Sequence, residues 1–519
     1  MPIYLISVIL FCYYSLKGGI ENKYLNTFLY YAIFALFIML FFTTSSPIYP
    51  FNLWTDENIY YAVGQGMIHG KTLYTDMFDH KGPCFFALYM IAYLISPGKY
   101  YGVYLIESIL MAVSLFCIHR IALRYMSENV SHLAAVMMIP FLLNSGYIGK
   151  GGSFEQMAIS SLLYSVLLLM PEYTNSDKTS KHIYVKYIVL GFIFSTIFFS
   201  KFNVSFTWLV LVIPSLVRII VNKKILKLIR CILAYFGGVL INVLWIVIYF
   251  KGNIQIPIEY YILFNKKYGA ITSIPDACIR IVNKIYSEVQ KYPLSFVFIV
   301  IGISLLIFID SRMNAYGKFA VIFAFVVIVG TTYAGHRSYE YYYSIIASFS
   351  FWGIIELLSI INKKGIFDNI NTSMVLSIGF TSFCLTFIIN DQILDSIFIQ
   401  REPYPQDIFA AQMNLYSPLD TSFYECGMME WGFCSQAKAD PYVQYFFYPN
   451  IDESKCPEVL NGQLDYINNQ TTQFIITYGF DIDSPPYIPG LNENYHEISK
   501  IQYHHKTGES FWLYQKNNI

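Results

Sequence analysis

Hydrophobic segments of membrane-spanning length recur along the chain and end near residue 390. A run of about 20 apolar residues is typical of a transmembrane helix. The pattern predicts about twelve helices. The first, at residues 2–14, is short and lacks the basic residues that precede a cleaved signal peptide. The other predicted spans are 25–43, 102–122, 131–148, 154–171, 184–200, 203–221, 229–250, 294–309, 318–334, 343–361 and 372–390.

Composition supports this reading. The 519 residues are 55% hydrophobic and only 13% charged, and a soluble domain carries roughly twice that charge. The formal net charge is zero, so no overall field favours nucleic acid. We therefore expect residues 1–390 to form an all-α polytopic membrane domain.

The positions of the basic residues orient the predicted helices. Cytoplasmic loops are enriched in Lys and Arg, and the basic clusters fall in alternate loops. We therefore expect loop 44–101, loop 251–293 and the tail 391–519 to be extracytoplasmic. The clusters are Lys17 and Lys23; Arg120 and Arg124; Lys178, Lys181 and Lys186; Arg218, Lys223, Lys224, Lys227 and Arg230; Arg312 and Lys318; and Lys363 and Lys364.

Loop 44–101 contains two predicted helices that do not cross the membrane. Residues 83–96 are too short to span, and counting them as a span would place basic clusters on both sides. The stretch TDENIYYAVGQGMIHG has apolar residues at helical spacing, with Thr55 placed to cap it and Asp56 and Glu57 in its first turn. We expect both helices to lie at the outer interface. Loop 251–293 offers a third amphipathic helix, with Ile281, Val282, Ile285 and Val289 on one face.

The tail is polar, and its strand-like runs TSFYEC, QFIITYG and SFWLYQ accompany a helical EVLNGQLDYINNQ. A small α/β domain is predicted. An extracytoplasmic tail permits a disulfide between two of Cys426, Cys434 and Cys456, with one thiol left over.

Charged residues gather at the predicted outer ends of the helices. The stretch YTDMFDHKGP holds Asp76, Asp79, His80 and Lys81. Charge at membrane depth is costly and usually faces a cavity or a partner, so we expect one site built from several loops. Sugar transfer from a lipid phosphate needs these groups: cations for the phosphate, a carboxylate for the acceptor proton and aromatic faces for the sugar. Other outer turns supply Lys150 and Glu155, Lys201, and His336, Arg337 and Glu340.

The first loop resembles that of C-type (GT-C) polyprenyl-phosphate-dependent glycosyltransferases, a group that includes protein O-mannosyltransferases and aminoarabinose transferases. The shared pattern is Asp56-Glu57 at the start of a helix, then Tyr60, then Asp79-His80-Lys81-Gly82-Pro83. The family has Lys-Pro-Pro where this chain has Lys81-Gly82-Pro83. The resemblance covers about residues 25–390 and implies a sugar transferase in a bacterial cytoplasmic membrane. A base and a phosphate-binding cation on opposite sides of the bound sugar would predict inversion of the anomeric configuration.

The resemblance also implies roles for single residues. Asp56, with Glu57 beside it, would be the catalytic carboxylate, and Lys81 would contact the lipid phosphate. Substrate contacts would come from Tyr60, Asp79, His80, Glu155, Lys201, Arg337 and Tyr341. No cofactor is implied with certainty, and a divalent cation stays open.

Plainer interpretations of the same residues stay open. Asp56 and Glu57 suit a helix cap, Asp76 suits a turn, and His80 suits a metal ligand beside Asp76 or Asp79. Lys201 could extend its ammonium to the membrane interface without binding substrate, and residues 339–343 could form an interfacial aromatic belt. The alternative functions are a surface-polysaccharide polymerase or ligase that uses a lipid-linked oligosaccharide, a lipid or solute transporter, and a membrane receptor. The sugar and the acceptor, whether glycan, lipid or protein, are not fixed by the sequence.

Overall fold

The computed structural model describes residues 23–49, 51–52, 54–143, 151–174, 182–269, 273–335, 339–367, 370–389, 404–503 and 508–517. The chain divides into two compact units. The helical unit comprises Met1–Thr43, Tyr104–Gly252 and Gly269–Leu394; the loop–tail unit comprises Thr44–Val103, Asn253–Tyr268 and Asp395–Ile519. The division near residue 390 stays a prediction. Within the loop–tail unit, the tail is grouped with the first loop and with part of the loop 251–293.

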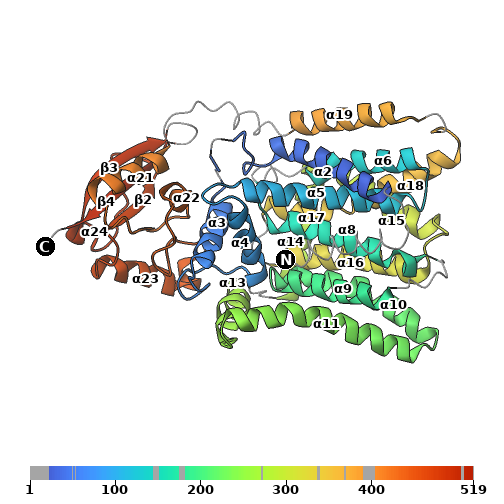
Figure 1. Ribbon diagram of the computed structural model, residues 1–519, viewed down its shortest axis with the longest axis horizontal. Helices are drawn as coiled ribbons and strands as arrows, with labels where there is room; N and C mark the ends of the chain where they lie inside the picture. Colours follow the sequence, from blue (N-terminus) through green and yellow to red (C-terminus); the bar gives the residue numbers. More distant parts are fainter. Residues whose placement is uncertain are drawn as a thin grey trace. The chain divides into compact units, whose positions relative to one another are not determined.

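The helical unit is built from long apolar helices that run side by side (Figure 1). Among the described residues, seven helices are long and apolar enough to cross a membrane, and a bent pair brings the candidates to eight. The predicted total of about twelve is therefore neither reached nor excluded, and the predicted span 2–14 lies outside the described residues. The helices are α2 (Lys23–Phe42), α5 (Tyr101–Ala122), α6 (Glu128–Met137), α7 (Ile139–Leu142), α8 (Phe154–Tyr173), α9 (Ile183–Phe198), η2 (Phe202–Ser205), α10 (Phe206–Val221), α11 (Ile225–Tyr249), α14 (Ile274–Lys291), α15 (Pro293–Phe308), α16 (Ala315–Tyr333), η4 (Glu340–Tyr342), α17 (Tyr343–Ala347), α18 (Ser350–Lys363) and α19 (Thr372–Ile389).

Apolar side chains cover the outward faces of these helices. On α11 an exposed stripe repeats at helical spacing, and its members are 53–74% exposed. Such a stripe is costly in water and favourable in lipid. Together with the number of apolar helices, it marks the chain as a multi-pass membrane protein. The stripe consists of Leu233, Phe236, Leu240, Leu244 and Ile248.

Close helix crossings in this unit depend on glycine. A Cβ added at Gly191 of α9 would lie 1.9 Å from the carbonyl oxygen of Tyr235 on α11, and one at Gly238 would lie 1.9 Å from that of Ile188. Without a hydrophobic driving force between helices in lipid, backbone approach of this kind provides much of the packing energy. The α9–α11 crossing is therefore specified by two small residues.

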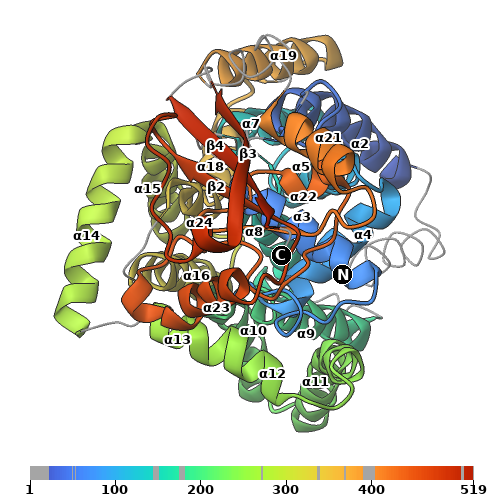
Figure 2. The same cartoon turned by 90° about the vertical axis from the view of Figure 1, so that its left-hand side faces the viewer.

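The predicted amphipathic helix of loop 251–293 is α14, which meets α15 at 112°. It lies at the edge of the helical unit (Figure 2). Val282 is 64% exposed and Val289 is 37% exposed. An apolar face exposed in this way suits a helix lying in a membrane interface.

The first loop forms a helix pair, α3 (Thr55–Ile68) and α4 (Pro83–Ile95), that packs closely at Gly64 and Tyr89. The predicted helix cap needs correction. Trp54, not Thr55, precedes the helix, and its main-chain N–H donates to Asn52 Oδ1 at 3.0 Å. Residues 57–67 are all buried, so α3 has no broad solvent face, because α4 and the tail helix α22 (Phe433–Ala437) pack against it.

The tail has the predicted α/β character. Its sheet has the order β1-β2-β4-β3, with β1 parallel to β2 and the other pairs antiparallel; Figure 2 shows β2, β4 and β3 side by side. All three predicted strands and the predicted helix are confirmed, and β3 was missed. The other elements of the loop–tail unit are β1 (Phe423–Glu425), β2 (Phe474–Gly479), β3 (Tyr495–Tyr503), β4 (Glu509–Lys516), α12 (Gln255–Pro257), η3 (Ile258–Leu263), α13 (Phe264–Tyr268), α21 (Pro405–Tyr416), η5 (Glu453–Lys455), α23 (Pro457–Asn468) and α24 (Leu491–Asn494).

The expected disulfide is absent from the described residues. Cys426, Cys434 and Cys456 are free thiols, and all three are buried. They occupy separate places: Cys426 follows β1, Cys434 lies in α22, and Cys456 packs with Phe78 and Val459 in an apolar cluster. Each behaves as a small hydrophobic residue.

Candidate functional site

The first turn of α3 separates the two adjacent carboxylates. Glu57 is fully buried and accepts a hydrogen bond from the Ser45 hydroxyl. Asp56 is only partly buried, and its Oδ2 accepts a hydrogen bond from the Tyr60 hydroxyl at 3.4 Å. The helix N-terminus favours the ionised form of a carboxylate. Of the two predicted catalytic residues, Asp56 is the one that a ligand can approach.

The loop before α4 fixes the backbone of Lys81. Its N–H donates to Asp79 Oδ1 at 2.7 Å, and its carbonyl oxygen accepts from the Tyr74 hydroxyl at 2.7 Å. Gly82 then precedes α4, and Pro83 takes the first helical position, where its fixed φ suits a helix start. Tyr74 itself is buried with φ +75°, an uncommon backbone conformation for a bulky residue that the surrounding contacts must hold.

Tyr60 connects the lysine to the catalytic candidate. The Lys81 ammonium lies 5.2 Å from the centroid of the Tyr60 ring, while the hydroxyl of the same residue donates to Asp56. The ring is held edge-to-face by Phe85 at 4.7 Å and by Tyr89 at 5.5 Å. A cation over an aromatic face is attracted by the ring quadrupole. One buried tyrosine therefore positions a carboxylate and an ammonium.

Asp79 responds to the same charges. Burial raises its pKa, the Lys81 ammonium and backbone N–H partly oppose this, and the Asp56 carboxylate raises it further. Asp56, Asp79 and Lys81 therefore form one electrostatic group.

His80 and Asp76 have structural contacts. The Nδ1 of His80 lies 3.9 Å from Asp79, and its carbonyl oxygen accepts from the Asn265 side chain. Among the described residues, neither belongs to a group with metal-binding geometry. Asp76 Oδ2 accepts the backbone N–H of Thr72 at 2.6 Å, which is the turn role that we left open for it.

The tail holds this loop through contacts that the sequence did not reveal. The Phe78 N–H donates to the Gln444 carbonyl at 2.7 Å, and the Gln444 side chain donates to the Tyr74 carbonyl at 2.8 Å. At the C-terminal end of α3, Gln65 and the following residue His69 both contact Asp440. These partners lie about 370 residues apart in sequence, so no local pattern signals them.

The helical unit has its own charged group. Lys201 lies 2.5 Å from Glu155, and its ammonium is 3.5 Å from the centroid of the Tyr342 ring. The predicted Tyr341 is buried, and its ring contacts Tyr342 edge-on at 4.8 Å and stacks on Tyr339 at 5.6 Å. Glu340 pairs with Lys291. His336 and Arg337 lie outside the described residues.

Two further groups have side chains suited to a metal, and sequence reasoning missed both. His119, Glu128 and His132 form one, and Glu425, Glu430 and Cys434 form the other. The second group is fully buried in the tail, where burial raises the pKa of Glu430 to about 7. The Glu128–His132 spacing of four residues was a readable signal, whereas the others are assembled by the fold.

Comparison with known proteins supports the architecture. ArnT from Cupriavidus metallidurans bound to undecaprenyl phosphate aligns over 95% of this chain and 98% of its own, at 10% identity and a TM-score of 0.59. Its apo form gives a TM-score of 0.62 at 9% identity, with the same coverage. The arabinofuranosyltransferase AftD from Mycobacteria aligns over 96% of this chain but only 40% of its own, at 9% identity and a TM-score of 0.53. No family model and no curated protein matches the sequence. The expected resemblance is therefore confirmed at the level of the fold, which this chain shares with ArnT and AftD.

Proposed function

We propose that this protein transfers a sugar from a polyprenyl-phosphate donor to a hydroxyl acceptor. The observation that carries the proposal is the group around Tyr60. The Tyr60 hydroxyl bonds to the partly exposed carboxylate of Asp56, and the Tyr60 ring lies beside the ammonium of Lys81. The backbone N–H of Lys81 is in turn bonded to a carboxylate in the same loop. The fold shared with ArnT, which is bound to undecaprenyl phosphate in its crystal structure, supports a lipid phosphate as the donor group.

The proposed reaction divides the work between these two residues. Asp56 accepts the proton of the acceptor hydroxyl as its oxygen bonds to the anomeric carbon. The bond between that carbon and the phosphate oxygen breaks, and Lys81 stabilises the negative charge of the departing lipid phosphate. Direct displacement inverts the anomeric configuration and needs no covalent glycosyl-enzyme. Glu57 is assigned to holding the start of α3, because it is buried against Ser45.

The purified full-length protein, reconstituted in lipid, tests this proposal. We expect it to release polyprenyl phosphate from at least one member of a panel of synthetic polyprenyl-phosphate sugars, and Asp56→Asn to slow the release by about 10²–10⁴. NMR of the product gives the anomeric configuration. Binding of undecaprenyl phosphate without sugar release from any donor would favour a lipid carrier or a transporter instead.

The proposed orientation places loop 44–101 and the tail outside the cell and residues 222–230 inside it. Single cysteines at Thr75, Asn450 and Asn222 test this by labelling intact cells with a membrane-impermeant maleimide. The background needs Cys278→Ser, because that thiol is exposed. Labelling at Thr75 and Asn450, but not at Asn222, is expected. Protection of either outer position would reverse or break the orientation.

A further inference from the structure

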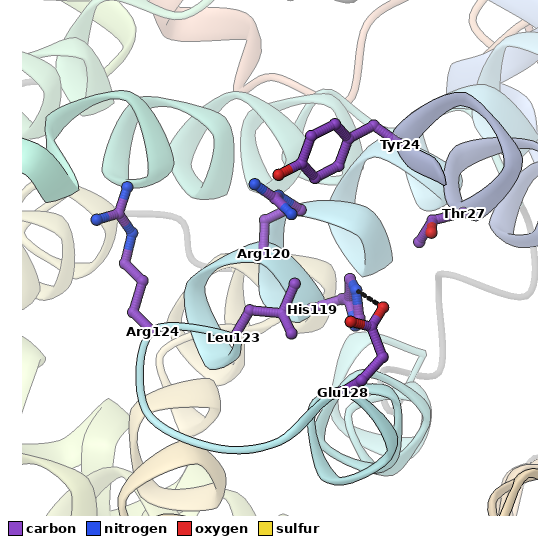
Figure 3. Close-up of a pocket in the computed structure, with 7 residues that line it drawn as sticks. All are labelled: Tyr24, Thr27, His119, Arg120, Leu123, Arg124 and Glu128. Atoms are coloured by element: carbon purple, nitrogen blue, oxygen red, sulfur yellow. Dashed lines mark ion pairs between the residues drawn. The ribbon is translucent and has the colours of Figure 1, made fainter. Parts of the chain in front are cut away.

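Two imidazoles and a carboxylate meet where α5 ends and α6 begins. The rings of His119 and His132 are stacked with centroids 4.1 Å apart and planes at 23°. The Nε2 atoms of the two rings lie 3.7 and 3.8 Å from Glu128 Oε1. Figure 3 shows His119 and Glu128 directed toward each other. Three atoms of the types that bind transition metals therefore converge within 4.8 Å of one another.

The local sequence preorganises two of these ligands. Glu128 and His132 lie four residues apart on α6, so both project from one face of the helix. Glu128 is in the first turn of α6, where the helix dipole stabilises an ionised carboxylate. The third ligand, His119, is in the last turn of α5 and is 1% exposed. Its imidazole is therefore fixed by packing.

A hydrogen bond from a third helix orients His132. The hydroxyl of Tyr31, on α2, lies 2.7 Å from His132 Nδ1. Donation of the Nδ1 hydrogen to this oxygen leaves the Nε2 lone pair facing Glu128. A metal-bound histidine nearly always uses its other nitrogen in this way.

The group also has an entry path. It lies beside a cavity of about 340 Å³ whose lining includes His119 and Glu128. In Figure 3 the Arg120 guanidinium is directed to the Tyr24 ring, with its carbon 3.9 Å from the ring centroid, and Arg124 points away from His119. The cavity leaves room for a water molecule as a further ligand. The other lining residues are Thr27 and Leu123.

We propose that His119, Glu128 and His132 bind a divalent transition metal, with Zn²⁺ the best match. Two histidines and one carboxylate plus water complete a four-coordinate zinc site. Bond lengths of about 2.0–2.1 Å place tetrahedral ligands about 3.3 Å apart, so the two measured separations from Glu128 need to close by about 0.4–0.5 Å. The metal would join the ends of α5 and α6. This site is independent of the proposed sugar transfer.

Metal content of the tag-free full-length protein tests the site. After purification without chelators, inductively coupled plasma mass spectrometry should find about one zinc per chain, as expected for a single site. His132→Gln and Glu128→Gln should lose that zinc. Both positions are partly exposed, so these changes are better tolerated than one at His119. The matched control is His182→Gln, an exposed histidine at the start of α9, which should retain the zinc.

Two further readouts decide the case. Cobalt exchanged into the wild type should give the strong visible absorption of a four-coordinate nitrogen and oxygen site, and His132→Gln should lose it. Added zinc should raise the Tm of apo wild-type protein and of His182→Gln, because a ligand of the folded state stabilises it, but not that of His132→Gln. The proposal is overturned if the wild type holds no zinc and gives no cobalt absorption, or if His132→Gln and His182→Gln hold equal zinc. The group would then be a contact between two histidines and Glu128 without a metal.

Discussion

The charged groups around Lys81 and Lys201 use the same residue types in different ways. In the loop–tail unit, Asp79 binds the backbone N–H of Lys81, and the ammonium lies 5.2 Å from the centroid of the Tyr60 ring. In the helical unit, the Lys201 ammonium itself is 2.5 Å from Glu155 and 3.5 Å from the centroid of the Tyr342 ring. Asp79 is hydrogen-bonded to the backbone of Lys81, whereas Glu155 pairs with the side chain of Lys201.

This difference bears on what each lysine can do. A new anion at Lys201 has to compete with Glu155, which is only 4% exposed, for the same ammonium. We therefore expect Lys201 mainly to stabilise the helical unit, whereas Lys81 stays the predicted contact of the lipid phosphate.

The largest effect on turnover is expected at Asp56, the proposed general base of the group around Lys81. Asp56→Asn keeps the shape and the hydrogen bond from Tyr60 but removes the base. General-base contributions are about 10²–10⁴ in rate, so kcat should fall by that order while donor binding persists. Single-turnover kinetics with a verified donor measures this, with Asp483→Asn, an 84% exposed carboxylate, as control. Near-normal turnover of Asp56→Asn would show that the first loop is not the catalytic centre.

A smaller effect, on binding rather than on rate, is expected for Lys81. Removing a charged hydrogen-bond partner typically costs about 1.5–3 kcal/mol, so Lys81→Ala should weaken donor binding about 10- to 100-fold. Lys71→Ala is the matched control, because Lys71 also lies over a tyrosine ring, that of Tyr442, at 5.9 Å. A titration of undecaprenyl phosphate measures both. Equal losses in the two variants would show that general charge, not this position, binds the phosphate.

Replacing Lys201 should lower the stability of the protein rather than its affinity for the donor. Lys201→Met leaves the buried Glu155 carboxylate without its ion-pair partner, and such a change at a fully buried pair costs about 3–5 kcal/mol. Because Lys201 is 17% exposed, we expect roughly 1–3 kcal/mol, seen as a lower Tm. The double variant with Glu155→Gln should recover much of it.

The pair Lys291–Glu340 supplies a control in the same unit. Its side chains are 45% and 39% exposed, so Lys291→Met should cost roughly 0–1 kcal/mol. If Lys201→Met were as stable as this control but bound donor poorly, the contrast between Lys81 and Lys201 would be wrong.

The smallest effect is a pH dependence from Asp79. Its pKa is raised in the folded protein, first by burial. The folded state therefore binds more protons than the unfolded state between the two pKa values, and stability falls as pH rises from the ordinary aspartate range through the raised value. Asp79→Asn keeps an acceptor for the Lys81 N–H and should flatten this dependence in Tm measured from pH 4 to 8. If the dependence of Tm on pH were unchanged in Asp79→Asn, a group other than Asp79 would be responsible for it.

The sequence by itself determined the apolar helices, the predicted tail strands and the residues of the first-loop motif. Hydrophobic periodicity and turn chemistry are local, so the helix at Pro83, the turn at Asp76 and the carboxylates at the start of α3 could all be read from neighbouring residues. The overall fold is shared with ArnT and AftD.

Only the tertiary structure decided which of these groups are available and which are already engaged. Burial of Glu57, pairing of Lys201 with Glu155, and contact of Gln444 with the first loop all depend on segments distant in sequence. The convergence of His119 with Glu128 and His132 likewise depends on how α5 and α6 pack. The sequence gives the type of each charged side chain, but packing determines its solvation and its partners. Solvation and partners in turn decide whether the side chain binds a ligand or stabilises the fold.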